Sequence, residues 1–165
     1  MQSKNFKYPD TKAFEFVIQR LGEKGIFTKD IAQITYDLQA DKIDDLNVVL
    51  LEQQVIEVLH KREVLNSMMV GLELDRLAQE KQLAEPLQEI VANDAGVFGV
   101  DEIIAIAIAN IYGTIGVTNF GYVDRVKTGI IKQLDTSEEH VNTFIDDLVG
   151  ALAAAVAAKT AHAIA

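Results

Sequence analysis

Apolar residues recur along most of the chain at the three- and four-residue spacing of amphipathic helices, whereas strand-type alternation is scarce. The first apolar stripe consists of Phe14, Val17, Ile18 and Leu21. It ends near Gly22 and Gly25, and glycine commonly terminates a helix. Thr28 is predicted to cap the N-terminus of the next helix. The apolar face of that helix is Ile31, Ile34, Tyr36 and Leu38.

A longer apolar segment starts near Asp44 and continues to about residue 83. Its pattern leaves room for a break between His60 and Leu65. Pro86 fits the first turn of a short helix over residues 87–93, because a proline there loses no helical hydrogen bond. The first half of the chain is therefore predicted to be helical throughout.

The second half continues with a buried helix from Asp101 to about Tyr112, a glycine-rich loop, and a helix over residues 122–134. Thr136 and Glu139 have the spacing of a capping box, which predicts that the last helix begins at Thr136. The elements add up to about six to eight helices and no strand. The predicted fold class is therefore all-α, a compact helical bundle.

The chain length of 165 residues suits a single all-helical domain over residues 1–165. The C-terminal segment places small residues at helical spacing, namely Gly150, Ala153, Ala154 and Ala157. Small residues let helices approach closely. The last helix is therefore expected to be packed on several sides or to lie between copies of the chain in a homo-oligomer.

The amino-acid composition of the chain limits the classes of function that it can have. Hydrophobic residues make up 49% of the chain and charged residues 24%, which is ordinary for a globular protein. A formal net charge of −10 argues against a nucleic-acid-binding surface and gives no attraction to an anionic membrane. Metal cations, by contrast, are drawn to carboxylates. The absence of cysteine excludes disulfides, thiolate zinc sites and cysteine nucleophiles, and is compatible with a cytoplasmic location.

One segment is long enough to test against a membrane span. Residues 103–123 are 21 residues without a charge, nominally the length of a transmembrane helix. The second half of this segment, however, contains three glycines, two threonines and an asparagine within nine residues. The alanine-rich stretch after Asp147 has only eleven uncharged residues, and the polar N-terminus lacks the apolar region of a signal peptide. No transmembrane segment is expected.

Two adjacent aspartates, Asp146 and Asp147, lead into the alanine-rich stretch. With a helix start at Thr136 they lie about ten residues into the last helix, too far for stabilisation by the helix dipole. Adjacent helical residues point about 100° apart, so one aspartate can face the core while the other faces solvent. One interpretation is that Asp147 pairs with a lysine or arginine and Asp146 is solvated.

A second acidic pair, Asp101 and Glu102, precedes the most hydrophobic helix. Asp101 can simply be an N-cap or first-turn residue. If the two apolar helices pack together, however, up to four carboxylates converge, and such groups repel one another and raise each other's pKa. A bound cation relieves that repulsion, and oxygen ligands suit Mg²⁺, Mn²⁺ or Ca²⁺.

Asp124 and Lys127 lie between the two acidic pairs, and their spacing places them on one helical face. They can form an ordinary surface ion pair of little energetic value. Alternatively, Lys127 is a basic group beside a metal site, where it holds a phosphate oxygen. Thr118 and Asn119 precede them and could add hydrogen bonds.

Three segments in this order resemble the phosphatidylglycerophosphatase A family: VDEIIA at 100–105, YVDRVKTGIIKQLD at 122–135 and FIDDLVGALAAA at 144–155. The resemblance is closest to a soluble Bacillus-type branch, where it extends over KREVLNSMMVGLELDRLAQ. Thr128 stands where the family usually has proline, and a family stretch of the form G-L-L-P-x-A-P-G-T-x-G-S is not found.

The resemblance implies a Mg²⁺-dependent phosphatase that converts phosphatidylglycerophosphate to phosphatidylglycerol, or one that acts on a small phosphomonoester. It assigns metal binding to Asp101, Glu102, Asp146 and Asp147. Asp124 and Lys127 receive a catalytic role towards the metal or the phosphate. It further implies a central apolar helix surrounded by others, self-association, and contact with a membrane at most at its surface.

Two other function classes stay open at this point. The first is a non-catalytic helical assembly or binding protein that keeps the family core and uses its acids in ion pairs. The second is a helical nucleotide pyrophosphohydrolase, but Glu85 and Glu89 are one residue too far apart for the expected E-x-x-E motif. His60, His140 and His162 show no metal-ligand spacing, although His140 can approach Asp147.

Overall fold

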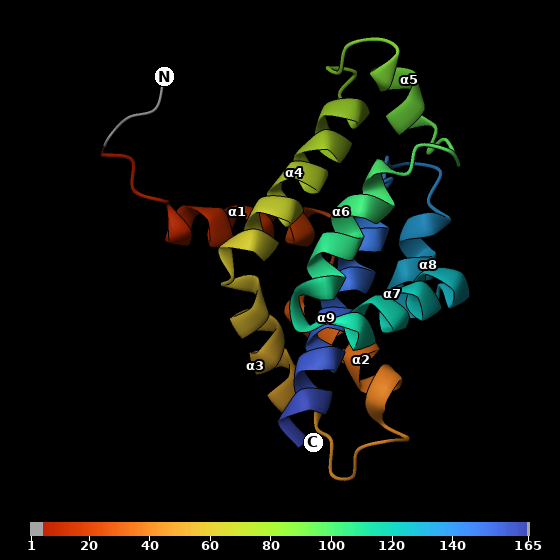
Figure 1. The fold of residues 1–165 in the computed structure, drawn as a ribbon. Helices are drawn as coiled ribbons and strands as arrows, with labels where there is room; N and C mark the ends of the chain where they lie inside the picture. Colours follow the sequence, from red (N-terminus) through yellow and green to blue (C-terminus); the bar gives the residue numbers. More distant parts are fainter. Residues whose placement is uncertain (1–4, 165) are drawn as a thin grey trace.

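The computed structural model describes residues 5–164, and all regular structure in that range is helical (Figure 1). The nine α-helices and one 3₁₀ turn are α1 (Asp10–Glu23), α2 (Thr28–Gln39), α3 (Val48–Leu59), α4 (Arg62–Gln79), α5 (Leu87–Ala92), α6 (Val100–Ala109), η1 (Asn110–Tyr112), α7 (Thr114–Val126), α8 (Gly129–Asp135) and α9 (Ile145–Ile164). The predicted all-α class is confirmed, as is the break between α3 and α4 near His60.

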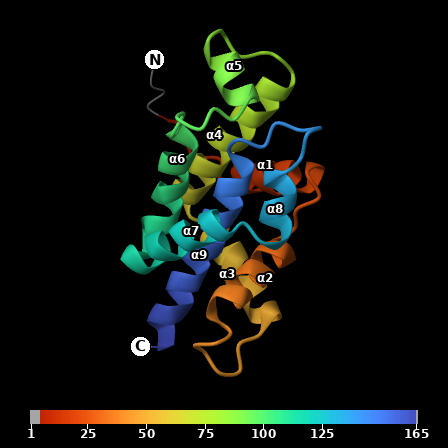
Figure 2. The same cartoon turned by 90° about the vertical axis from the view of Figure 1, so that its right-hand side faces the viewer.

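Helix α9 is the central element of the bundle. It runs through the middle of the molecule with the other helices around it, as both views show (Figures 1 and 2). Every residue from Phe144 to Ala158 is buried, and α9 contacts α2, α3, α4, α6, α7 and α8. Its alanines allow hydrogen bonds from neighbouring helices: Thr35 Oγ1 donates to the Ala153 carbonyl at 3.2 Å. The central helix implied by the family resemblance is therefore confirmed.

Helix α6 is less buried than its sequence predicts. One face packs on α9 through Ala105, Ile108 and Ala109, but the opposite face carries Ile103, which is 68% exposed. The prediction of a fully buried helix is wrong for that outer face. No helix in the described part of the chain is long and apolar enough to cross a membrane.

The predicted glycine-rich loop is also wrong, because residues 114–126 form α7. Gly116 lies where α7 meets the end of α6: a Cβ atom there would come within 2.0 Å of the Ala109 carbonyl oxygen. The glycine therefore permits a close helix contact and does not break the helix. Helix α7 ends at Val126 because Lys127 adopts a left-handed conformation, and the next helix, α8, begins at Gly129.

The last helix begins at Ile145, nine residues later than the capping box at Thr136 predicts. Thr136 instead follows the last residue of α8, and its hydroxyl donates to the Lys132 carbonyl at 2.8 Å. Residues 136–144 form the connection that leads into α9. This shift places Asp146 and Asp147 in the first turn of the central helix.

Candidate active site

The start of α9 is held by a carboxylate from another helix. Asp75 of α4 is 2% exposed, and its two oxygens each accept the Phe144 N–H at 3.1 Å. One of them also accepts the Ile145 N–H at 3.0 Å. Asp75 therefore satisfies the free N–H groups that every helix start leaves, although it lies some seventy residues earlier in the chain. This contact fixes the direction of the first turn.

Asp146 and Asp147 occupy that first turn, where the positive end of the helix dipole favours negative charge. Both are buried, at 5% and 6% exposed. Burial raises the pKa of Asp146 to about 6, against the opposing effect of Lys127. Burial and the carboxylates of Asp146, Asp124 and Asp101 raise the pKa of Asp147 to about 8. The interpretation of a solvated Asp146 and a paired Asp147 is wrong, because Asp146 carries the ion pair.

The first turn of α6 forms the opposite wall. Its N-cap is Gly99 in a left-handed conformation, so Asp101 is a first-turn residue and not the cap. Asp101 is 8% exposed, and its Oδ1 has no hydrogen-bond partner within the described residues. Glu102 reaches towards solvent, and desolvation together with the carboxylates of Asp101 and Asp124 raises its pKa.

Lys127 joins three acidic side chains. Its Nζ lies 2.5 Å from Asp135 Oδ1, 3.2 Å from Asp146 Oδ2 and 3.8 Å from Asp124 Oδ1. Burial disfavours the charged lysine, but Asp135 and Asp146 outweigh it and raise the pKa of Lys127. The expected Asp124–Lys127 contact is present, yet it is the longest of the three. Lys127 is thus the shared cation of an acidic cluster.

Seven charged side chains line one cavity of about 180 Å³, called the acidic cavity below. Its charged lining consists of Asp94, Asp101, Glu102, Asp124, Asp146, Asp147 and Lys127. The prediction that the two acidic pairs converge is therefore confirmed. Thr118 and Asn119 do not line the cavity. The Thr118 hydroxyl instead donates to the Thr114 carbonyl within α7. His140 lines a neighbouring pocket instead.

Three residues of this region were missed from sequence. Asp94 has a positive φ of 46°, a conformation that Asn and Asp tolerate better than most residues, and the Asn-Asp pair at 93–94 is a weak signal for it. Asp75 lies between Leu72 and Ala78 on the buried face of α4. An acidic residue at such a position needs hydrogen-bond partners, and this is the signal that could have identified it. Asp135 gives no local signal, since only the fold brings it to Lys127.

The donor chemistry of the acidic cavity fits a hard divalent cation. All the charged donors except Lys127 are carboxylates, and one oxygen of Asp101 is buried without a partner. The side chains do not form a ready-made ligand cage: within residues 5–164, no three acidic or histidine groups are close enough to hold an ion as they stand. Coordination of a metal ion at this cavity would therefore require side-chain rotation.

Fold and cavity together define an all-helical protein with an acidic site at the start of its central helix. The family model described as phosphatidylglycerophosphatase A matches residues 18–162. The chain belongs to this family.

Two relatives from Bacillus subtilis (strain 168) support the assignment. The uncharacterized protein YpjQ is 44% identical over 156 residues, covering 94% of this chain and 88% of YpjQ. The uncharacterized protein YutG is 46% identical over 144 residues, covering 87% of each chain. Both are similar over nearly their whole length.

Solved structures agree with the fold. The crystal structure of YpjQ superposes with a TM-score of 0.90 at 43% identity, covering 95% of this chain and 98% of that one. The low temperature requirement C protein from Listeria monocytogenes gives a TM-score of 0.89 at 42% identity, covering 92% of this chain and 96% of that one. The arrangement around α9 is thus shared with experimentally determined relatives.

Proposed function

We propose that this chain is a Mg²⁺-dependent phosphatase related to phosphatidylglycerophosphatase A, which hydrolyses a phosphomonoester such as phosphatidylglycerophosphate to phosphatidylglycerol. The observation that carries the proposal is the acidic cavity, a single space of about 180 Å³. It is lined by six acidic side chains from α6, α7, α9 and residue 94, and by Lys127, the residue that follows α7. Membership of the family supports the same reaction class.

The charge balance of the cavity supports a metal-dependent reaction. The acidic side chains of the cavity outnumber its single lysine, so the cavity would repel a phosphate dianion unless positive charge is added. Asp101, Glu102, Asp146 and Asp147 would hold Mg²⁺, for which Mn²⁺ or Ca²⁺ could substitute at oxygen ligands. When bound, the ion neutralises phosphate charge and lowers the pKa of water.

The other polar groups of the site would bind the phosphate, orient the attacking water and hold the start of α9 in position. Lys127 has three N–H donors, of which Asp135 and Asp146 engage two, so one is left for a phosphate oxygen. Such a donor stabilises charge that develops on the transferring phosphoryl group. Asp124 is partly exposed at the same cavity and can accept a hydrogen bond from the attacking water. Asp75 holds the start of α9 and so keeps Asp146 and Asp147 in position.

The test is the Mg²⁺-dependent release of phosphate from phosphatidylglycerophosphate by wild type and by Asp147→Asn. Removing one carboxylate from the first turn of α9 should lower kcat at least a hundredfold while the helical circular-dichroism signal is kept. Glu63→Gln, an exposed acid on α4 outside the cavity, is the matched control and should retain wild-type activity. Full activity of Asp147→Asn would contradict the assignment.

The ion pair between Lys127 and Asp146 favours a second candidate, a non-catalytic helical assembly protein whose acids serve structure. Calorimetric titration of chelator-treated protein with Mg²⁺ and Mn²⁺ separates the two. Heat of binding that disappears in Asp147→Asn supports the phosphatase. An absence of binding at millimolar metal supports the assembly protein.

A further inference from the structure

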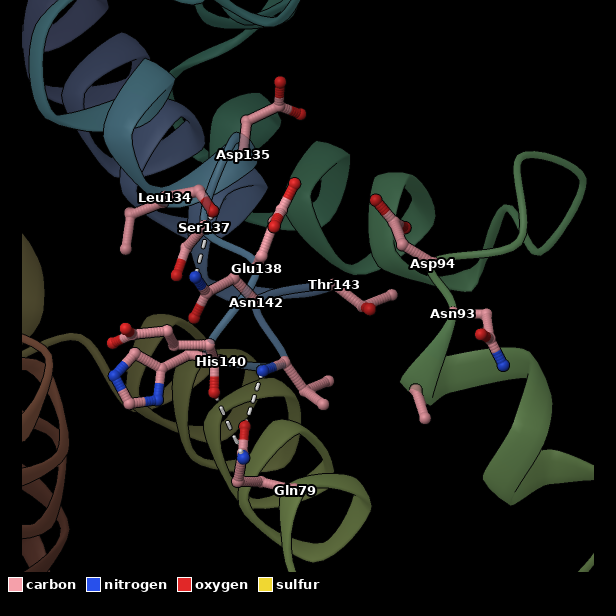
Figure 3. Close-up of a pocket in the computed structure, with 13 residues that line it drawn as sticks. Gln79, Asn93, Asp94, Leu134, Asp135, Ser137, Glu138, His140, Asn142 and Thr143 are labelled. Carbon is pink, nitrogen blue, oxygen red and sulfur yellow. Dashed lines mark hydrogen bonds between the residues drawn. The ribbon is translucent and has the colours of Figure 1, made fainter.

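The ammonium group of Lys127 contacts carboxylates on two sides of the wall of the acidic cavity. Asp146 and Asp124 line the cavity and lie 3.2 Å and 3.8 Å from its Nζ. Asp135 lies closer, at 2.5 Å, but does not line the cavity. It lines a neighbouring pocket of about 440 Å³ instead, and Figure 3 shows its carboxylate turned away from Gln79 at the other side of that pocket. Lys127 therefore has two partners inside the cavity and one outside it.

The backbone at Lys127 is fixed, whereas the side chain can move. Lys127 ends α7 with a φ of 42°, and its backbone N–H donates to the Val123 carbonyl at 2.9 Å. Only Thr128 separates it from the start of α8. The four-carbon side chain beyond this fixed point is flexible, so the position of Nζ depends on the charges around it.

The place of Asp135 in its own helix does not favour a negative charge. Asp135 is the last residue of α8, where the negative end of the helix dipole disfavours an acid. Among the described residues, its carboxylate forms no hydrogen bond or ion pair except the one with Lys127. The contact with Lys127 is therefore the one that accounts for a carboxylate at this position.

The carboxylate of Asp146 competes with Asp135 for the same ammonium group. The side chain of Asp146 is buried, whereas that of Asp135 is partly exposed, and opposite charges attract more strongly away from water. Without Asp135, Lys127 would move towards Asp146 and Asp124. A lysine in that place would occupy carboxylate oxygens and repel a divalent cation.

We propose that Asp135 is a positioning residue, which holds the ammonium of Lys127 at the edge of the acidic cavity and keeps it from competing with a metal ion for Asp146. The inference rests on the proposed function, because it places Mg²⁺ at the start of α9. At the edge of the cavity, Lys127 keeps one N–H to donate to a phosphate oxygen. Asp135 acts through Lys127 and touches neither the metal ion nor the phosphate.

Calorimetric titration of the chelator-treated, full-length chain with Mg²⁺ tests the inference. Asp135→Asn frees Lys127 to pair with Asp146 and should raise the Kd for Mg²⁺ roughly fivefold or more. Lys127→Met removes the competing charge and should lower the Kd. The double variant Asp135→Asn/Lys127→Met should differ from Lys127→Met by less than about twofold, because no ammonium is left to position.

Glu138→Gln is the matched control for the change in charge. Glu138 is exposed and lines the same neighbouring pocket as Asp135, but the ion pairs of Lys127 within the described residues are with other acids. Its replacement removes one negative charge without moving the ammonium, so the Kd for Mg²⁺ should stay within about twofold of wild type.

The effect of Asp135→Asn with and without Lys127 is the deciding comparison. Equal effects in the two backgrounds, or equal effects of Asp135→Asn and Glu138→Gln, would overturn the inference, since Asp135 would then act only through its charge. An ion pair that only joined α7 to α8 would change the free energy of unfolding but would leave the Kd for Mg²⁺ unchanged in Asp135→Asn, which would also overturn it.

Phosphate release separates this inference from the function on which it rests. Coupling between Asp135 and Lys127 in Mg²⁺ binding, without hydrolysis of phosphatidylglycerophosphate, would support the positioning role and contradict the phosphatase. Mg²⁺-dependent hydrolysis without such coupling would support the phosphatase and contradict the positioning role. An absence of Mg²⁺ binding in both wild type and Lys127→Met would contradict both.

Discussion

At the scale of single residues, Asp75 links stability to the geometry of the site. Its buried carboxyl group accepts the N–H groups of Phe144 and Ile145, directly before the two aspartates of the acidic cavity. Burial raises its pKa to about 8, although those two backbone donors act in the opposite direction. The folded chain therefore holds a proton on Asp75 at pH values where the unfolded chain, with a pKa near 3.8, has lost it.

This difference predicts how stability depends on pH. Between about pH 4 and pH 8 the unfolded state binds fewer protons than the folded state at Asp75, so the free energy of unfolding falls as pH rises. Asp75→Asn stays neutral and should reduce that slope by up to about 1.4 kcal/mol per pH unit. Urea unfolding of both proteins at pH 5 and pH 8 measures the effect, and identical slopes would contradict it.

At the scale of helices, the contact between α6 and α7 depends on one glycine. A Cβ atom at position 116 would lie 2.0 Å from the backbone oxygen of Ala109, and a backbone atom cannot turn aside as a side chain can. Gly116→Ala should therefore lower the free energy of unfolding by about 1–3 kcal/mol, the usual cost of overpacking.

Gly121→Ala is the matched control on the same helix. Position 121 is exposed, and a methyl carbon added there would have no neighbouring atom within 4 Å, so alanine should stabilise α7 by about 0.5–1 kcal/mol through its helix propensity. Chemical denaturation of the two variants gives both values. Equal effects at positions 116 and 121 would show that close packing is not the reason for the glycine.

The helices themselves could largely be predicted from sequence, whereas their ends could not. Apolar spacing located α1 to α4 because the signal is local. Gly116 was misread because a glycine that allows helix contact and a glycine that breaks a helix look the same in sequence. The start of α9 was misplaced because its cap, Asp75, comes from a distant part of the chain.

The residues of the candidate site could likewise be predicted from sequence only in part. The acidic pairs could be predicted to converge, since each precedes an apolar helix that must be buried. The places of Asp94 and Asp135 near this site could not be predicted, because the two residues lie on a connection and at a helix end whose positions depend on tertiary contacts.

At the scale of the whole molecule, divalent metal should stabilise the fold. Burial and the neighbouring carboxylates both disfavour a charged Asp147 and raise its pKa, and a bound cation would offset both effects. At a Mg²⁺ concentration one hundred times its Kd, linkage adds about 2.7 kcal/mol, or about 5–10 °C in Tm. Differential scanning calorimetry of chelator-treated protein with and without Mg²⁺ measures this shift.

Two controls make this measurement specific. NaCl at matched ionic strength screens the net charge of −10 and should give a much smaller shift. The double variant Asp146→Asn/Asp147→Asn removes two buried carboxyl groups from the first turn of α9 and should lose the response to Mg²⁺. A shift that NaCl reproduces in full, or that the double variant retains, would argue against metal binding at the start of α9.

The central position of α9 also bears on how the protein is made. This helix follows α1 to α8 in the chain, yet it supplies the surface on which most of them pack. During translation, the earlier helices leave the ribosome before their shared partner exists, and their apolar faces stay uncovered. The bundle can close only once the alanine-rich segment has emerged, so folding of α1 to α8 into the bundle waits for the synthesis of α9.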